Sequence, residues 1–251
     1  MSSATTLQGP TPMMTPPFSS SEVAALNARF EQAHPSEVLR WAIDHFRPDV
    51  AMTSSFGTRS AALIHMAVQV DPAISIRLVD TGFLFPETLQ FAETLRKRFN
   101  LNLQIFRTAM DVEQFKREHA DLPLEHPDYC CGEYKIEATK RALAGLRCWI
   151  TGLRRAEAAT RATTPFVEVL NNGMAKISPL ANWSAKQLHQ YLMQHDLPYH
   201  PLFEKGYTSI GCYPCTQKPP DPNDPRSGRW VGQNKTECGI HDIGKAARPL
   251  E

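Results

Sequence analysis

Four cysteines, arranged as two pairs, constrain this chain more than any other feature of its sequence. Cys130 and Cys131 are adjacent, and Cys212 and Cys215 form a C-x-x-C. Thiolates are strong ligands for zinc and for iron–sulfur clusters, so four of them at one point predict a metal centre. Neighbouring side chains point apart in helices and strands, so an adjacent pair serves one site only where the backbone bends. Two unrelated sets of thiols, or two disulfides, are the alternatives.

Composition limits the class of protein that carries this centre. The 251 residues fit one large domain with an extension, and 42% of them are hydrophobic, which is enough for a core. A net charge of +1 gives no case for a nucleic-acid or membrane partner. No apolar run approaches the roughly 20 residues of a membrane span, and the N-terminus does not resemble a signal peptide. We therefore expect a cytoplasmic protein with reduced cysteines. A monomer and a homo-oligomer are both compatible with this sequence.

Three segments are expected along the chain. Residues 1–20 carry no charge and are rich in Ser, Thr, Pro and Met, so we expect a disordered leader. Residues 21–218 form the folded domain with the metal centre, beginning near Ser21 as a helix N-cap. Residues 219–251 are rich in loops and prolines, and we expect them to fold over the site as a mobile tail.

Strand and helix patterns alternate over much of the chain. This rhythm predicts an α/β fold with a mostly parallel sheet and helices on both faces, followed by a loop-rich C-terminal segment. Ligands of such sheets bind beyond the carboxyl ends of the strands. Predicted strands cover 49–53, 74–79, 101–106 and 148–151; a predicted hairpin joins 166–170 to 174–177; predicted helices cover 21–46 with a break at Pro35, 61–68, 86–99, 112–119, 133–146 and 183–195.

Three of the predicted strands end in groups that suit a nucleotide. The first opens into a loop of small residues at a helix start, where backbone N–H groups attract anions. An aspartate after the second can bind a ribose or a base, and arginines after the fourth can bind phosphate or sulfate oxygens. Each group alone fits an ordinary turn equally well, but their convergence on one rim favours a site. The candidates are Ser54, Ser55, Phe56, Gly57, Asp80, Gly152 and Arg154.

Cations elsewhere in the sequence suit the same anionic ligand. Lys135 lies four residues after Cys131, about one helical turn away, where its ammonium would offset thiolate charge or hold an anion. Arg226 and Arg229 lie three residues apart in a proline-bounded loop, which suits an anion clamp. Solvent-facing side chains are the alternative in both cases.

The two unpaired cysteines have different sequence contexts. Cys238 lies close to Lys235 and His241, and nearby cations lower the pKa of a thiol and favour the nucleophilic thiolate. The alternative interpretation of Cys238 is a surface thiol without a function. Cys148 lies in an apolar stretch beside Trp149, so we expect an inert core residue.

Together these motifs resemble the assimilatory sulfonucleotide reductases, in particular the iron–sulfur branch that reduces adenosine 5′-phosphosulfate (APS). The resemblance runs from about Asp49 to His241. It implies an adenine nucleotide alpha hydrolase-like fold, a [4Fe–4S] cluster on the two cysteine pairs, and Cys238 as nucleophile. The segments that carry it are 54–57, 79–82, 130–135, 151–155, 212–215, 226–229 and 237–241.

The resemblance also implies a reaction. Cys238 would attack the sulfur of APS, AMP would leave, and thioredoxin would release sulfite from the S-sulfocysteine, while the cluster shapes the field of the site without passing electrons. The helix start at 54–60, with Arg226 and Arg229, would hold the phosphate of AMP. Lys135, Arg154 or His241 would hold the sulfate oxygens. The sequence departs from the family pattern around His126 and over 156–161, so it assigns no role to His126 or Arg161.

Other functions stay open at this point. A reductase for the 3′-phosphorylated nucleotide (PAPS), or one with dual specificity, is the nearest, although members restricted to PAPS typically lack the two cysteine pairs. An ATP-dependent thiolation enzyme needs a loop written S-G-G-x-D-S, and residues 54–60 lack its aspartate. A zinc-stapled binding module is the non-enzymatic alternative.

Overall fold

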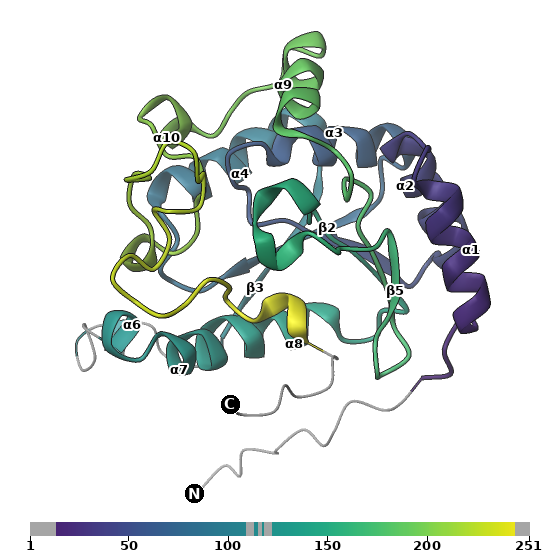
Figure 1. The fold of residues 1–251 in the computed structure, drawn as a ribbon, viewed down its shortest axis with the longest axis horizontal. Helices are drawn as coiled ribbons and strands as arrows, with labels where there is room; N and C mark the ends of the chain where they lie inside the picture. The colour runs from purple at the N-terminus through teal and green to yellow at the C-terminus, as the bar shows by residue number, and fades with distance from the viewer. Residues whose placement is uncertain (1–13, 109–112, 115–116, 118–121, 244–251) are drawn as a thin grey trace, which may run out of the picture.

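A six-stranded sheet organises the computed structural model, which describes residues 14–243 apart from 109–112, 115–116 and 118–121 (Figure 1). The strand order is β3-β2-β1-β4-β6-β5, and all neighbours are parallel except β5 and β6. The predicted α/β fold with a mostly parallel sheet is confirmed. The strands are β1 (Val50–Thr53), β2 (Ser75–Asp80), β3 (Asn102–Arg107), β4 (Cys148–Ile150), β5 (Val167–Val169) and β6 (Ala175–Ile177).

The strand order reverses between β1 and β4. From β1 the chain moves outward through β2 to β3, then crosses back and places β4 on the other side of β1. These two strands pair from Val50 with Cys148 to Met52 with Ile150. Loops that leave the carboxyl ends of two such strands diverge and open a crevice, which is the usual ligand site of an open α/β sheet.

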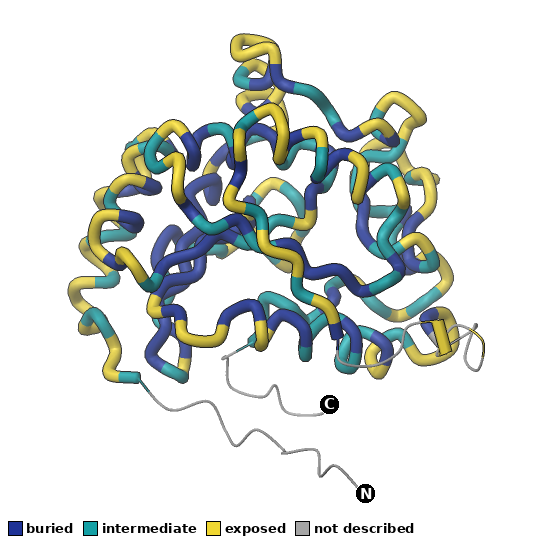
Figure 2. The backbone as a smooth tube through the Cα atoms, turned by 180° about the vertical axis from the view of Figure 1, so that it is seen from behind, coloured by how far each residue is buried: buried dark blue, intermediate teal, exposed yellow. Residues whose placement is uncertain are grey.

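Helices cover both faces of the sheet (Figure 1). The large core lies under α2, α3, α4 and α9, whereas α8 packs Ala138 and Ala142 against Val79 on the opposite face. Figure 2 shows buried backbone concentrated in the sheet between these layers. The longer helices are α1 (Ser20–Phe30), α2 (Pro35–Phe46), α3 (Ser60–Val70), α4 (Pro86–Phe99), α8 (Glu137–Leu143) and α9 (Ala185–Gln194); the shorter are α6 (Leu122–Glu125), α7 (Pro127–Cys131) and α10 (Pro201–Glu204).

The N-terminal end of the fold begins slightly earlier than predicted. Ser19, and not Ser21, caps α1, because its hydroxyl accepts from the N–H of Glu22 while the Glu22 carboxylate accepts from the N–H of Ser19. Before it, Met14 donates its N–H to the carbonyl of Asn172 at 2.9 Å, and Phe18 packs on the ring of Trp41. The end of the expected leader therefore contacts the domain, and residues 1–13 lie outside the described part of the chain.

The segment that carries the first cysteine pair differs from the helix predicted over 133–146. The helix begins at Pro127 in α7, widens into a π-helical turn, η1 (Gly132–Ile136), and continues as α8. The bend expected at Cys130 and Cys131 is therefore a change of helical pitch directly after them. Such wide turns are frequent at functional sites.

The rest of the predicted elements agree with the structure where it describes them. The hairpin turns across 171–173, and Ser184 caps α9 with its hydroxyl and the Gln187 side chain. The helix predicted over 112–119 lies largely outside the described residues. No described helix is long and apolar enough to cross a membrane. Short helical turns complete the fold at η2 (Arg155–Glu157), η3 (Ala159–Arg161), η4 (Tyr213–Cys215) and η5 (Ile240–Asp242).

Candidate active site

A cavity of about 310 Å³ lies where the strand order reverses. Its walls come from the loop after β1, the loop after β4 and the C-terminal segment. Its size and position match those of pre-formed small-molecule sites. The structure brings ten of the twelve expected substrate-binding and catalytic residues to this cavity: Ser54, Ser55, Gly57, Lys135, Gly152, Arg154, Arg226, Arg229, Cys238 and His241.

Phe56 and Asp80 do not line the cavity. Phe56 has a positive φ of 49° and a fully buried ring in the main core. The carboxylate of Asp80 accepts from the N–H of Gly82 at 2.9 Å and from Arg107 at 2.9 Å. These bonds shape the turn after β2 and join it to β3, and the contact of Asp80 with a ribose or base stays a prediction.

The loop after β1 presents polar backbone to the cavity. The Ser60 hydroxyl donates to the carbonyl of Gly57, and the Thr58 hydroxyl donates to the carbonyl of Thr208. Arg59, at the N-cap of α3, makes no side-chain capping bond. In the first turn, the N–H groups of Ser60 and Ala62 donate to the carbonyls of Gly57 and Arg59, so the helix dipole is what favours an anion at this end of α3.

Cys238 lies buried on the wall of the cavity and packs against Cys215 and Trp230. Burial alone would raise the pKa of its thiol. Lys135, the N–H of Ile240 and Arg229 outweigh this effect and hold the pKa below its ordinary value.

The two residues expected to lower the pKa of this thiol make other contacts in the structure. Lys235 forms an ion pair with Asp128. The ring of His241 stacks on Trp149 at 5.7 Å between centroids, and His241 lines the same cavity as Cys238. The cations that lower the pKa of Cys238 are Lys135 and Arg229, which are distant from it along the chain, so the sequence context of Cys238 alone did not identify them.

The four paired cysteines converge beside the cavity. Burial and the neighbouring thiols of Cys131, Cys212 and Cys215 raise the pKa of Cys130 to about 12. All four thiols are free of disulfides. Within the described residues, no group of three or more His, Cys, Asp or Glu side chains is arranged to hold a metal ion.

The neighbourhood of these cysteines nevertheless fits a larger group. An iron–sulfur cluster carries several irons, so its four thiolate ligands stand farther apart than the ligands of one ion. The Nε1 of Trp230 is buried next to Cys215 and has no hydrogen-bond partner among the described residues. A cluster would bring acceptors to such a donor, and four cysteines are its usual ligand set.

Arg229 approaches the chain closely at the base of the C-terminal segment. Its guanidinium lies over Trp230 at 4.4 Å from the ring centroid and donates through Nε to the carbonyl of Cys215. A Cβ added at Gly211 would lie 2.3 Å from the Nη2 of Arg229. Glycine at position 211 therefore leaves the room that this arginine occupies.

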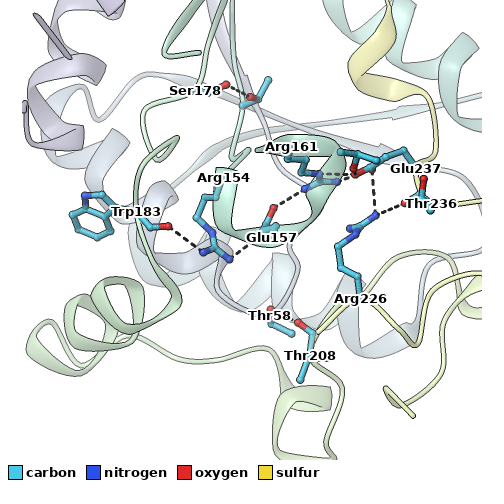
Figure 3. A network of polar contacts seen from close by, with 12 residues as sticks. Thr58, Arg154, Glu157, Arg161, Ser178, Trp183, Thr208, Arg226, Thr236 and Glu237 are labelled. Carbon is cyan, nitrogen blue, oxygen red and sulfur yellow. Dashed lines mark hydrogen bonds and ion pairs between the residues drawn. The ribbon is translucent and has the colours of Figure 1, made fainter. Parts of the chain in front are cut away.

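A chain of ion pairs crosses the cavity wall and was not expected from the sequence (Figure 3). Arg154 pairs with Glu157 at 3.0 Å, and Glu157 pairs with Arg161 at 2.5 Å. Arg161 then holds Glu237 through two bonds of 2.7 Å, and Arg226 joins Glu237 at 3.2 Å. The spacing of Glu157 and Arg161 fits a local pair, but the contact of Arg161 with Glu237 spans 76 residues and leaves no local signal.

The fold is that of the adenine nucleotide alpha hydrolase-like class, with a cavity where the strand order reverses. Residues 49–218 match the family model described as the phosphoadenosine phosphosulfate reductase domain. The chain belongs to this family, which confirms the resemblance seen in its sequence, and it is an oxidoreductase of the APS/PAPS reductase type.

Relatives in this family carry two kinds of name. The chain is 38% identical over 229 residues to a protein of Salinibacter ruber named adenosine 5′-phosphosulfate reductase, covering 90% of both chains. It is 40% identical to a protein of Gloeobacter violaceus named phosphoadenosine 5′-phosphosulfate reductase, covering 86% of this chain and 92% of that one. A crystal structure of the phosphoadenylyl-sulfate reductase of Candida auris in a phosphate complex superposes with a TM-score of 0.72 at 28% identity. The superposition covers 81% of this chain and 100% of the Candida auris chain.

Proposed function

We propose that this protein reduces adenosine 5′-phosphosulfate to sulfite and AMP, with Cys238 as nucleophile. The observation that carries this proposal is the buried Cys238 thiol on the cavity wall, beside Lys135 and Arg229. A thiolate held near cations in a nucleotide cavity suits attack on an electrophilic sulfur.

The reaction balances in two stages. The Cys238 thiolate forms a bond to the sulfur of the sulfonucleotide while the bond between that sulfur and the phosphate oxygen breaks, so AMP leaves and Cys238 carries a sulfonate. A thiolate of thioredoxin, which is the proposed reductant, then attacks the Sγ of Cys238 and releases sulfite. The second thioredoxin thiol resolves the mixed disulfide, so the dithiol supplies both electrons.

The cavity offers stabilisation for the leaving AMP. The positive end of the α3 dipole and the guanidinium of Arg229 favour the phosphate charge that develops as the bond breaks. Lys135 is half-buried, and its loss of hydration lowers its pKa, but the negative charge of the Cys238 and Cys212 thiolates raises that pKa above the ordinary value, so Lys135 stays protonated. It suits a sulfonate oxygen better than Arg154, whose guanidinium is paired with Glu157.

Cys130, Cys131, Cys212 and Cys215 would hold a [4Fe–4S] cluster. Bound there, the cluster would supply fixed negative charge and a cross-link between α7 and the C-terminal segment. We propose a three-part organisation, with a leader over 1–20, a nucleotide-binding domain over 21–218 that contains all four cysteines, and a tail over 219–251 that carries Cys238. Because all six cysteines are unpaired, we place the protein in the reducing cytoplasm.

Two substrates have to be distinguished, because relatives carry both names. The two cysteine pairs favour APS. The test is sulfite release by purified protein with reduced thioredoxin, measured separately with APS and with PAPS. We expect a kcat/KM for APS at least about tenfold higher, which corresponds to about 1.4 kcal/mol. A preference for PAPS would reject the APS assignment, and no sulfite from either nucleotide would reject the reaction.

A further inference from the structure

The segment around Cys238 is anchored to the domain on both sides. On the N-terminal side, Glu237 accepts from Arg161, Arg226 and Thr160. On the C-terminal side, Lys176 of β6 donates to the carbonyl of His241 at 2.9 Å, and the His241 ring stacks on Trp149 of β4. Cys238 therefore remains buried only while this short segment is held in place.

Gly239 makes the turn between these two anchors. It has a φ of +74°, and an added Cβ would approach the Cδ1 of Ile136 at 3.2 Å. The segment thus bends sharply after Cys238 and meets the π-helical turn that follows the first cysteine pair.

The N-terminal anchor uses cations that line the nucleotide cavity. Each of the three nitrogens of the Arg161 guanidinium already donates to a carboxylate oxygen, through Nε and Nη2 to Glu237 and through Nη1 to Glu157. The Nη2 of Arg226 donates both to Glu237 and to the carbonyl of Thr236 (Figure 3). In this state neither guanidinium is available in full to an anionic ligand.

The Glu237 carboxylate is ionised in this setting. Burial alone would raise the pKa of its carboxyl, but Arg161 and Arg226 hold that pKa below the ordinary value. A charge-assisted, two-bonded pair between carboxylate and guanidinium is among the stronger polar contacts in proteins. A phosphate or sulfonate oxygen offers the same guanidinium the same type of acceptor.

We propose that Glu237 is a positioning residue that seats Cys238 over the cavity, and that its carboxylate competes with the anionic group of the nucleotide for Arg161 and Arg226. This inference rests on the proposed function only in taking a nucleotide as the ligand. Nucleotide binding then loosens the anchor on the N-terminal side of Cys238, because the nucleotide and Glu237 bind the same two arginines. The anchor on the C-terminal side uses Lys176 and Trp149 instead, so it keeps Cys238 at the cavity while the nucleotide is bound.

The test compares Glu237→Gln with Glu31→Gln in the full chain. The glutamine keeps the shape of the side chain but removes its charge. Glu31 is a matched control because it also binds an arginine, Arg155, through two bonds of 2.7 and 3.0 Å, away from the cavity. Two quantities are measured, the affinity for 5′-AMP by calorimetry and the hydrogen exchange of peptides covering 231–243 by mass spectrometry.

If Glu237 competes with the nucleotide for Arg161 and Arg226, removing its charge should strengthen nucleotide binding. Glu237→Gln binds 5′-AMP more tightly, by about threefold or more, because two guanidiniums are released for the phosphate. The same variant exchanges its 231–243 amides at least about tenfold faster, since one anchor is lost. Glu31→Gln changes neither quantity.

A residue with a merely structural role would weaken 5′-AMP binding or leave it unchanged, and either result for Glu237→Gln overturns the competition. Unchanged exchange of 231–243 overturns the positioning role. Glu237→Asp serves where the glutamine variant does not fold, because its shorter carboxylate cannot keep both bonds to Arg161 and must shift both quantities in the same directions. Neither measurement needs turnover, so absence of sulfite release would reject the proposed function and leave this result standing.

Discussion

Two buried thiols of this chain differ in what surrounds them. Cys148 lies in the centre of the sheet with no exposed surface, and burial alone raises the pKa of its thiol. Cys238 is also buried, but it faces a cavity with Lys135 and Arg229 beside it. The proposed nucleophile therefore differs from the core cysteine not in its burial but in the cations and the cavity next to it.

This contrast gives a prediction with an internal control. Cys238→Ser removes the proposed nucleophile, and we expect sulfite release from APS to fall by at least about a thousandfold. Cys148→Ser places a hydroxyl in the core and changes sulfite release by no more than a few fold, because position 148 does not reach the cavity. Mass spectrometry after one exposure to APS without thioredoxin should find a sulfonate adduct in the Cys148 variant and none in the Cys238 variant. An adduct in Cys238→Ser would show that another thiol attacks.

At the scale of single elements, the sequence predicted the regular structure better than the contacts between elements. Alternating and helical patterns are local, so β1 to β4, the hairpin and α4 follow from the residues themselves. The polar loops after β1 and β4 were recognised for the same reason. The ion pair between Arg161 and Glu237, which holds the C-terminal segment on the domain, was not recognised, because these residues meet only after the chain has folded.

The first cysteine pair lies on α7, and the second lies at the N-cap and the end of η4; these elements join only in the folded chain. Cys212 enters this group beside Thr81, whose hydroxyl lies 3.2 Å from its Sγ. Cys212→Ser should lower iron from about four per chain to less than half of that, and the visible absorbance with it, because one of four ligands is lost. Cys238→Ser should keep both, since Cys238 is not one of the proposed ligands. Iron analysis and absorbance spectra of the purified variants decide this, and equal iron in Cys212→Ser and wild type would remove Cys212 from the ligand set.

At the scale of the whole molecule, His200 connects parts that are distant in the sequence. Its Nδ1 accepts from the N–H of Leu202, its Nε2 meets the hydroxyl of Thr88 in α4, and its own N–H reaches the carbonyl of Thr58 in the loop after β1. The imidazole has no exposed surface, and burial lowers its pKa from 6.5 to about 4. A proton on Nδ1 would remove the acceptor that Leu202 uses, so the folded state holds this ring neutral.

The pH dependence of unfolding tests this arrangement. The unfolded chain takes up a proton on position 200 near pH 6.5, whereas the folded chain does so only near pH 4. The contribution of the neutral ring to stability is therefore complete above pH 6.5 and is lost as the pH falls toward 4. Between about pH 7.5 and 5.5 the loss amounts to about 1.3 kcal/mol in the free energy of unfolding.

Urea unfolding of wild type and His200→Asn at these two values isolates the effect. Asparagine keeps an acceptor for the N–H of Leu202 but does not titrate, so the variant should be less stable than wild type at the higher pH and lose about 1.3 kcal/mol less on acidification. If His200→Asn loses as much stability as wild type, the pH dependence originates elsewhere. Because the N–H of His200 donates to Thr58 in the loop that lines the cavity, a confirmed effect would connect the acid stability of the whole fold to the geometry of that cavity.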